Sequence, residues 1–327
     1  MAEGLITTAV GSFPKPDYLT QARSQLNRGQ IDQAELERLE RQATEYWIRL
    51  QERLGIDVLV HGEMERGDMV AYFADQLDSM KLGGLVRSYG NRYYHKPIIT
   101  DKLRWPGPMT VEMWQFAQGL TERPVKGMLT GAYTMVEWSF DEYYPNRREA
   151  VLDMARLIRE EVQALVAAGA KYIQIDEPAI HTRPDEDFDL AVESMAVTVE
   201  GIDAEFHTHI CYGDVPIVYQ DMLRLPVKQI HLAFKNTEWE LLKLLEDGSY
   251  PADKDLGVGV TDVHTRRIES VEEIVAGIEK TLEILPPERI WILPDCGLKT
   301  RTVEEAEDKL RVMMDAVRAV KRERGIN

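Results

Sequence analysis

The chain has 327 residues, of which 44% are hydrophobic and 29% charged, and its formal net charge is −17. This is the balance of an ordinary globular protein with a large core, and the acidic charge argues against nucleic-acid binding. No run approaches the ~20 consecutive apolar residues of a membrane span, so we expect no membrane association. The first residues lack the layout of a secretory signal, and two cysteines form no disulfide framework, which predicts a cytoplasmic protein.

Short apolar runs alternate with amphipathic segments along the chain. The runs predict strands, and in chain order they cover residues 5–12, 57–63, 125–131, 171–178, 205–211, 228–234, 256–263 and 289–297. Apolar residues at three- and four-residue spacing predict helices over 31–54 and 146–168, the second capped by Gly169. Two capping boxes predict the starts of two further helices, at Ser270 with Glu273 and at Thr302 with Glu305.

Strand and helix alternation of this kind predicts a parallel sheet, and eight strand candidates predict an α/β fold closed into a (β/α)8 TIM barrel. Residues 1–327 would then form a single domain. An open, doubly wound sheet is the structural alternative. Residues 64–124 interrupt the alternation, so we interpret them as an insertion after the second strand, a hairpin that folds over the barrel mouth.

Polar residues lie at or just beyond the C-terminal ends of six predicted strands, where barrel enzymes carry their chemistry. They are Ser12, Glu63, Asp176 with Glu177, His209 with Cys211, Asp262 with His264, and Asp295 with Cys296. Buried polar groups cost free energy unless they are paired, so a set that converges on one mouth indicates a site rather than core packing.

A metal site is the most specific interpretation of these residues. Alternate strand residues face the same way, so His207, His209 and Cys211 share one side, and Cys296 would lie across the mouth. Thiolates and imidazoles together suit Zn²⁺, and three protein ligands with an open position are typical of catalytic zinc. The alternative is that these cysteines are small buried apolar residues.

Seven segments resemble the C-terminal catalytic half of cobalamin-independent methionine synthase. In chain order they read TTAVGSFP, LVHGEMERGDMVAYF, GMLTGAYTMVEWSF, QIDEPA, HTHICY, GVGVTDVH and PDCGLKTR, and they lie between about residue 6 and residue 301. The resemblance implies a single catalytic TIM-barrel domain, a zinc-dependent methyltransferase that converts homocysteine to methionine.

The resemblance also implies roles for single residues. It implies zinc ligation by His209, Cys211 and Cys296, with His207 a structural neighbour rather than a ligand. The homocysteine-binding positions carry over onto Val10, Gly11, Ser12, Glu63 and Asp176. His264 matches the proton-donating histidine, although it could instead orient its loop through Asp262. Positions expected to contact the methyl donor are Arg92, Tyr93 and Trp138.

The chain departs from the full-length family in its methyl-donor positions. It has one barrel where the family has two, and in this it resembles short core methionine synthases. Thr182 stands where the family has a folate-contacting glutamate, and Tyr93 replaces a small residue near the expected pterin contact. These differences predict a donor such as methylcobalamin or another methylcorrinoid, delivered by a corrinoid protein, rather than methyltetrahydrofolate. A corrinoid leaving as cobalt(I) would not need His264 as an acid.

A second departure concerns the metal. The family's fourth ligand, a glutamate, falls on Ala233, whose methyl group cannot bind zinc. Three explanations are open: an engineered alanine variant, a natural site with three protein ligands and a water, or substitution by His231 on the same strand face. Two other functions also remain open. One is a related barrel methyltransferase with another thiol or donor, and the other is a zinc-ligand variant with impaired or lost activity.

Overall fold

The protein is described from a computed structural model that covers residues 4–88, 92–182, 188–211 and 213–326. The chain divides into two compact units. The first comprises Met1–Glu65, Met113–Lys126 and Gln229–Asn327, and the second comprises Arg66–Glu112 and Gly127–Lys228. Within the described residues, no helix is long and apolar enough to cross a membrane. The single-domain organisation and the position of residues 64–124 over the barrel mouth stay predictions.

The first unit contains four parallel strands, β1 (Ile6–Thr7), β8 (Gln229–Leu232), β9 (Asp255–Gly259) and β10 (Ile290–Leu293). The first strand pairs with the last, since Ile6 is opposite Trp291, and β10 and β8 both pair with β9. Its helices are α1 (Asp17–Asn27), α2 (Gln33–Leu54), α9 (Val271–Leu282) and α10 (Val303–Arg324), with 3-10 turns η2 (Glu240–Leu244) and η3 (Pro287–Arg289). Helix α4 (Val111–Gln118) lies at the sequence boundary between the units.

The predicted helix starts are confirmed by their caps. Both capping boxes form, because Ser270 and Thr302 accept bonds from Glu273 N and Glu305 N while those glutamates bond back to the cap nitrogens. Asp32 caps α2 through its side chain alone, which accepts from Glu35 N, and Gly55 ends that helix with a left-handed φ of 85°. Side-chain oxygens at these positions satisfy N–H groups that have no partner inside the helix.

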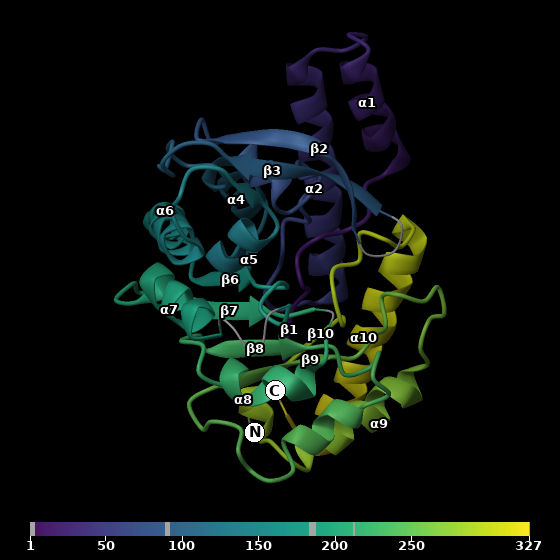
Figure 1. The fold of residues 1–327 in the computed structure, drawn as a ribbon. Helices are drawn as coiled ribbons and strands as arrows, with labels where there is room; N and C mark the ends of the chain where they lie inside the picture. Colours follow the sequence, from purple (N-terminus) through teal and green to yellow (C-terminus); the bar gives the residue numbers. More distant parts are fainter. Residues whose placement is uncertain (1–3, 89–91, 183–187, 212, 327) are drawn as a thin grey trace. The chain divides into compact units, whose positions relative to one another are not determined.

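The second unit contains parallel strands β4 (Gly127–Thr130), β6 (Tyr172–Asp176) and β7 (Glu205–His209), with β6 in the middle. Helices α6 (Arg147–Ala167) and α7 (Phe188–Val199) lie side by side in Figure 1, and α3 (Ala71–Ala74), α5 (Ala132–Glu137) and α8 (Val215–Met222) are shorter. Gly169, with φ of 108°, follows α6 as predicted.

A separate antiparallel hairpin occupies the predicted insertion. β2 (Met80–Ser88) pairs with β3 (Arg92–Ile99), and β5 (Phe140–Asp141) adds to β3, which makes a three-stranded sheet. The segment after β3 is held against α6. There the buried Glu161 accepts hydrogen bonds from Trp105 Nε1 at 2.9 Å and from Thr110 N at 2.7 Å. The β2–β3 hairpin thus lies within the predicted insertion, residues 64–124.

The larger sheet has seven strands in the order β1-β10-β9-β8-β7-β6-β4. A doubly wound sheet would reverse its strand order at a switch point, whereas here the order follows the chain and ends with the first strand beside the last. This is the topology of an α/β barrel of the TIM type.

The run at 57–63 does not form the expected strand. It makes single parallel bridges, from Leu59 to Val125 and from Gly62 to Ser12, and Val58 N bonds Thr7 O at 3.0 Å. Gly62 and Glu63 have φ of 93° and 58°, which breaks the extended backbone that a strand needs. The segment thus lies between β1 and residue 125 without being a regular strand.

Candidate metal and substrate site

Two of the predicted metal ligands follow β7. His209 is the last residue of that strand and is 2% exposed, and Cys211 is half-buried two residues later. Cys296 is half-buried and lies three residues beyond the end of β10. One ligand atom from each residue lies within 4.8 Å of the other two. The donor set of one imidazole and two thiols suits Zn²⁺.

Two other histidines were candidates for the metal. His207 is fully buried, and its Nε2 lies 2.9 Å from Glu205 Oε1, consistent with a structural role. His231 on β8 is also buried and was the candidate to replace the missing glutamate. Among the residues that the structure describes, the grouped donors are His209, Cys211 and Cys296, and neither of these histidines belongs to the group.

The expected fourth-ligand position, Ala233, comes directly after β8 and is half-buried. The backbone just beyond it is held by Asp295, a fully buried carboxylate that accepts from Asn236 N at 2.6 Å and from Lys235 N at 3.1 Å. Burial raises the pKa of Asp295 to about 8, although these two hydrogen bonds oppose the shift. Asp295, the residue before Cys296, therefore fixes the position of the backbone that follows Ala233.

The residues predicted to bind the substrate in the first unit lie together. Val10 and Gly11 are buried, Ser12 is half-buried, and Ser12 forms the parallel bridge with Gly62, next to Glu63. Ser12 also lies against the residue after Cys296, because a Cβ on Gly297 would be 2.2 Å from Ser12 Oγ. Ser12 and Glu63 are thus neighbours, and Ser12 adjoins the loop that carries one of the thiols.

Lys15 stabilises the unusual backbone at Glu63. Its Nζ donates to Glu63 O at 3.3 Å, where Glu63 has its left-handed φ of 58°. Burial lowers the pKa of Lys15 to about 8; nearby Arg23 adds to this effect, and Glu63 opposes it. A non-glycine residue in this backbone region needs support from its surroundings, and Lys15 supplies part of it.

Asp176 and Glu177 end β6 in the second unit. Asp176 is half-buried, and its Oδ1 accepts from Gln174 Nε2 at 2.7 Å. Glu177 is buried and accepts from Thr134 Oγ1 at 2.6 Å, from Thr134 N at 2.8 Å and from Tyr133 N at 3.1 Å. Burial raises the pKa of Glu177 to about 7, against the effect of these donors. Its own N–H donates to His209 O at 3.1 Å.

The sequence alone predicts no role for Glu177, but its surroundings in the structure indicate one. It joins the end of β6 to the start of α5 and to the backbone of a predicted metal ligand. Gly131 makes room for it, since a Cβ there would lie 2.0 Å from Glu177 Oε1. In the sequence, this role could be sought only in the GAYTM and IDEP segments, and neither segment alone reveals that the two are in contact.

The remaining predicted residues lie on exposed or half-buried segments. His264 is exposed in the loop after β9, and its backbone N–H donates to Asp262 Oδ1 at 2.8 Å. Trp138 follows α5 and is half-buried, and Tyr93 on β3 is 65% exposed. Arg92 belongs to β3, but its side chain is outside the described part. Thr182 Oγ1 donates to Ala179 O at 2.7 Å.

The fold and sequence match known proteins over nearly the whole chain. Residues 5–319 match the family model described as cobalamin-independent synthase, catalytic domain. Methionine synthase of Saccharolobus solfataricus is 39% identical over 320 residues, which cover 98% of this chain and 96% of that protein. Methionine synthase of Saccharolobus islandicus is 41% identical, with the same coverage of both chains.

A solved structure is similar over the same length. The B12-independent methionine synthase from Shewanella sp. W3-18-1, in complex with selenomethionine, has a TM-score of 0.86 and 24% identity, covering 98% of each chain. At this identity the likeness shows the fold, and it confirms the predicted TIM barrel. With the family model matching most of its length, this chain belongs to the cobalamin-independent methionine synthase family and corresponds to its catalytic domain.

Proposed function

We propose that the chain is a zinc-dependent methyltransferase that forms methionine from homocysteine. The observation that carries this proposal is the group of His209, Cys211 and Cys296, whose donor atoms lie within 4.8 Å of one another. One imidazole and two thiols are a donor set for Zn²⁺ that leaves a position for a substrate atom. Family membership supports homocysteine as the thiol that takes this position.

A bound Zn²⁺ would be held by these three residues and would lower the pKa of a coordinated thiol, which is otherwise ~8.5 and mostly protonated at neutral pH. Ala233 supports three protein ligands in this chain, because its side chain has no donor atom. Two thiolates balance the charge of Zn²⁺, whereas an added carboxylate would leave the site negative. The uncharged site is expected to activate a thiol more strongly.

The chain's own residues would bind and orient the amino-acid part of the substrate. The carboxylates of Glu63 and Asp176 suit its ammonium group, and the Ser12 hydroxyl suits its carboxylate. The contact of Ser12 with Gly297 supports this assignment, because it links the carboxylate position to the loop that carries Cys296. A sulfonate thiol such as coenzyme M has no ammonium for these carboxylates, which favours homocysteine over that alternative.

In the transfer itself, a bond forms between the substrate sulfur and the methyl carbon while the bond between the methyl group and its donor breaks. Holding sulfur and methyl carbon in line is where such a site gains rate. A pterin leaving group requires a proton, for which His264 is the candidate donor, whereas a corrinoid leaving group does not. Trp138, Arg92 and Tyr93 remain the proposed donor contacts.

A methylcorrinoid, delivered by a corrinoid protein, follows from the sequence differences at Thr182 and Tyr93. The cytoplasmic location also stays a prediction.

The test is methionine formation by zinc-loaded protein, given homocysteine and either methylcobalamin or methyltetrahydrofolate. Methionine from methylcobalamin supports the corrinoid donor, and methionine from the folate alone replaces it. Failure with both donors at full zinc occupancy would contradict the proposed function. The variant Cys296→Ser, which removes one thiolate, serves as the negative control.

A further inference from the structure

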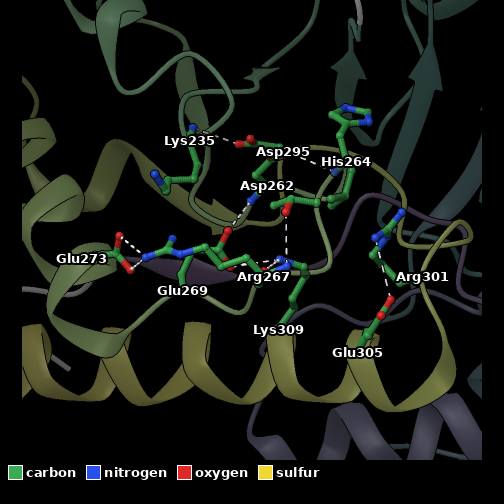
Figure 2. A network of polar contacts seen from close by, with 12 residues as sticks. Lys235, Asp262, His264, Arg267, Glu269, Glu273, Asp295, Arg301, Glu305 and Lys309 are labelled. Carbon is green, nitrogen blue, oxygen red and sulfur yellow. Dashed lines mark hydrogen bonds and ion pairs between the residues drawn. The ribbon is translucent and has the colours of Figure 1, made fainter. Parts of the chain in front are cut away.

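The loop that carries His264 is closed by a buried carboxylate (Figure 2). This loop, residues 262–269, lies between β9 and α9. At its start, Asp262 Oδ1 accepts from His264 N at 2.8 Å. At its end, Glu269 is 3% exposed, and its Oε1 accepts from Asp262 N at 2.9 Å. The two ends of the loop are therefore joined through one side chain.

A lysine from a distant helix holds the same loop. Lys309 lies on α10 and is fully buried, and Figure 2 shows it extending from the helix toward the loop. Its Nζ donates to Glu269 Oε2 at 3.0 Å and to Arg267 O at 2.6 Å. Lys309 thus contacts the loop at a side chain and at a backbone carbonyl, and it fixes the loop to α10.

A second charged contact of the loop, between exposed side chains, differs in kind. Arg267 pairs with Glu273 at 2.7 Å, but the Arg267 side chain is 57% exposed and that of Glu273 is 36% exposed. Exposed pairs of this type contribute little to stability. The Lys309 and Glu269 side chains are 0% and 1% exposed, so neither charge is compensated by water. Replacing a buried ion pair by an apolar pair is often neutral or stabilising, so stability alone does not explain this pair. The fixed geometry that it gives the loop is the better explanation.

We propose that Glu269 and Lys309 are positioning residues that hold His264 toward the reacting methyl donor. The chain of contacts runs from Lys309 to Glu269, from Glu269 to the Asp262 backbone, and from the Asp262 side chain to the His264 backbone. The inference rests on the proposed function with a donor whose leaving group takes a proton, because a corrinoid leaving group would not need His264 as an acid. A displacement of about 1 Å at such a residue can lower a rate ~100-fold.

The experiment compares the wild type with the double variant E269M/K309M, which removes both charges and leaves no buried ion unpaired. The matched control is D308N/R311M, which removes the exposed Asp308–Arg311 pair from the same helix. Zinc content and circular dichroism establish that each variant folds. For E269M/K309M we expect kcat to fall about 10- to 100-fold, while KM for homocysteine stays near the wild-type value. The control should keep wild-type kinetics.

The variant H264N separates positioning from general damage. In the H264N background, E269M/K309M should lower kcat no further. An equal loss in both backgrounds would overturn the inference, because the pair would then act independently of His264. Wild-type kcat in H264N with the donor that supports turnover would also overturn it, although methyl transfer itself would stand.

Limited proteolysis with trypsin tests the loop without requiring methionine formation. Arg266 and Arg267 are trypsin sites in the loop, with side chains 83% and 57% exposed. Trypsin should cut E269M/K309M in this loop several times faster than the wild type or D308N/R311M. An unchanged cleavage rate would contradict the inference even if methionine is formed. If no donor yields methionine, the proposed function falls, and faster cleavage would still show that the pair holds the loop.

Discussion

Two buried glutamates, one in each compact unit, hold strand ends by different means. Glu177 accepts hydrogen bonds from neutral N–H and O–H groups of Tyr133 and Thr134. Glu269 instead pairs with the cation of Lys309. Without a cation, burial dominates and raises the pKa of Glu177 to about 7. The contacts of Glu177 should therefore respond to pH, and those of Glu269 to the loss of its partner Lys309.

The largest expected effect is that of removing one of the two cysteine thiols, of which each unit contains one. Cys211→Ser and Cys296→Ser should each lose zinc and lower methionine formation well beyond the ~10- to 100-fold cost of losing an outer partner of a metal site. Zinc content by elemental analysis and product formation measure this. His209→Ala should behave alike, whereas His207→Gln on the same strand should retain zinc. Retention of full zinc by Cys296→Ser would rule out a shared ion.

The second prediction tests the ion-paired anchor. Lys309→Met leaves the carboxylate of Glu269 buried without its cation, so we expect the free energy of unfolding to fall by about 3–5 kcal/mol. Urea denaturation measures the change. The double variant E269M/K309M should recover much of this loss, because no charge is left unpaired. A Lys309→Met variant as stable as the wild type would remove the distinction between the two anchors.

The third prediction tests the neutral anchor by pH. The pKa of Glu177 is about 7 in the folded chain, above the ordinary value of 4.5. Between these values the folded state holds more protons than the unfolded state, so stability falls as pH rises through this window. At ~1.4 kcal/mol per pH unit, the fall from this group is about 3 kcal/mol. Glu177→Gln should lack that part of the slope, and urea denaturation from pH 4.5 to pH 7 compares the two proteins. Identical slopes would contradict the prediction.

The smallest expected effect is at Ala233. Ala233→Glu would add a carboxylate where the resemblance predicts the family's fourth ligand. Zinc release to a chelator should slow by roughly tenfold, at the low end of the range known for changes around metal sites. The more negative site should also activate the substrate thiol less, so methionine formation should slow. If zinc release and turnover are both unchanged, residue 233 plays no part in the site.

Much of the fold was predictable because strands such as β6, β9 and β10 are compact apolar runs, each followed by a helix. The run at 57–63 was wrong as a strand because Gly62 and Glu63 adopt left-handed backbone, which its apolar pattern does not reveal. Helix α1 was missed because it buries little apolar surface, chiefly Leu19 and Ala22, so its periodicity is weak.

The grouping of His209, Cys211 and Cys296 was predictable, because residue type and strand position agree for these three residues. Contacts between distant segments were not. Lys309 lies in a charged stretch that resembles a solvated helix face, yet its side chain is fully buried against a residue 40 positions away. Glu177 looks like a second strand-end charge beside Asp176, and only the packing of α5 against it explains its burial. Such partners depend on tertiary structure, for which short segments carry no signal.

The pairing of β1 with β10 has a consequence for how the chain is made. The partner of the first strand is the last strand to be synthesised, so β1 and β9 each have an unpaired edge until residues near Trp291 emerge. Unpaired edges invite association with other chains, and contacts between distant parts of a sequence form slowly. Newly made copies should therefore be most prone to aggregation, and most dependent on chaperones, in the interval before that final strand arrives.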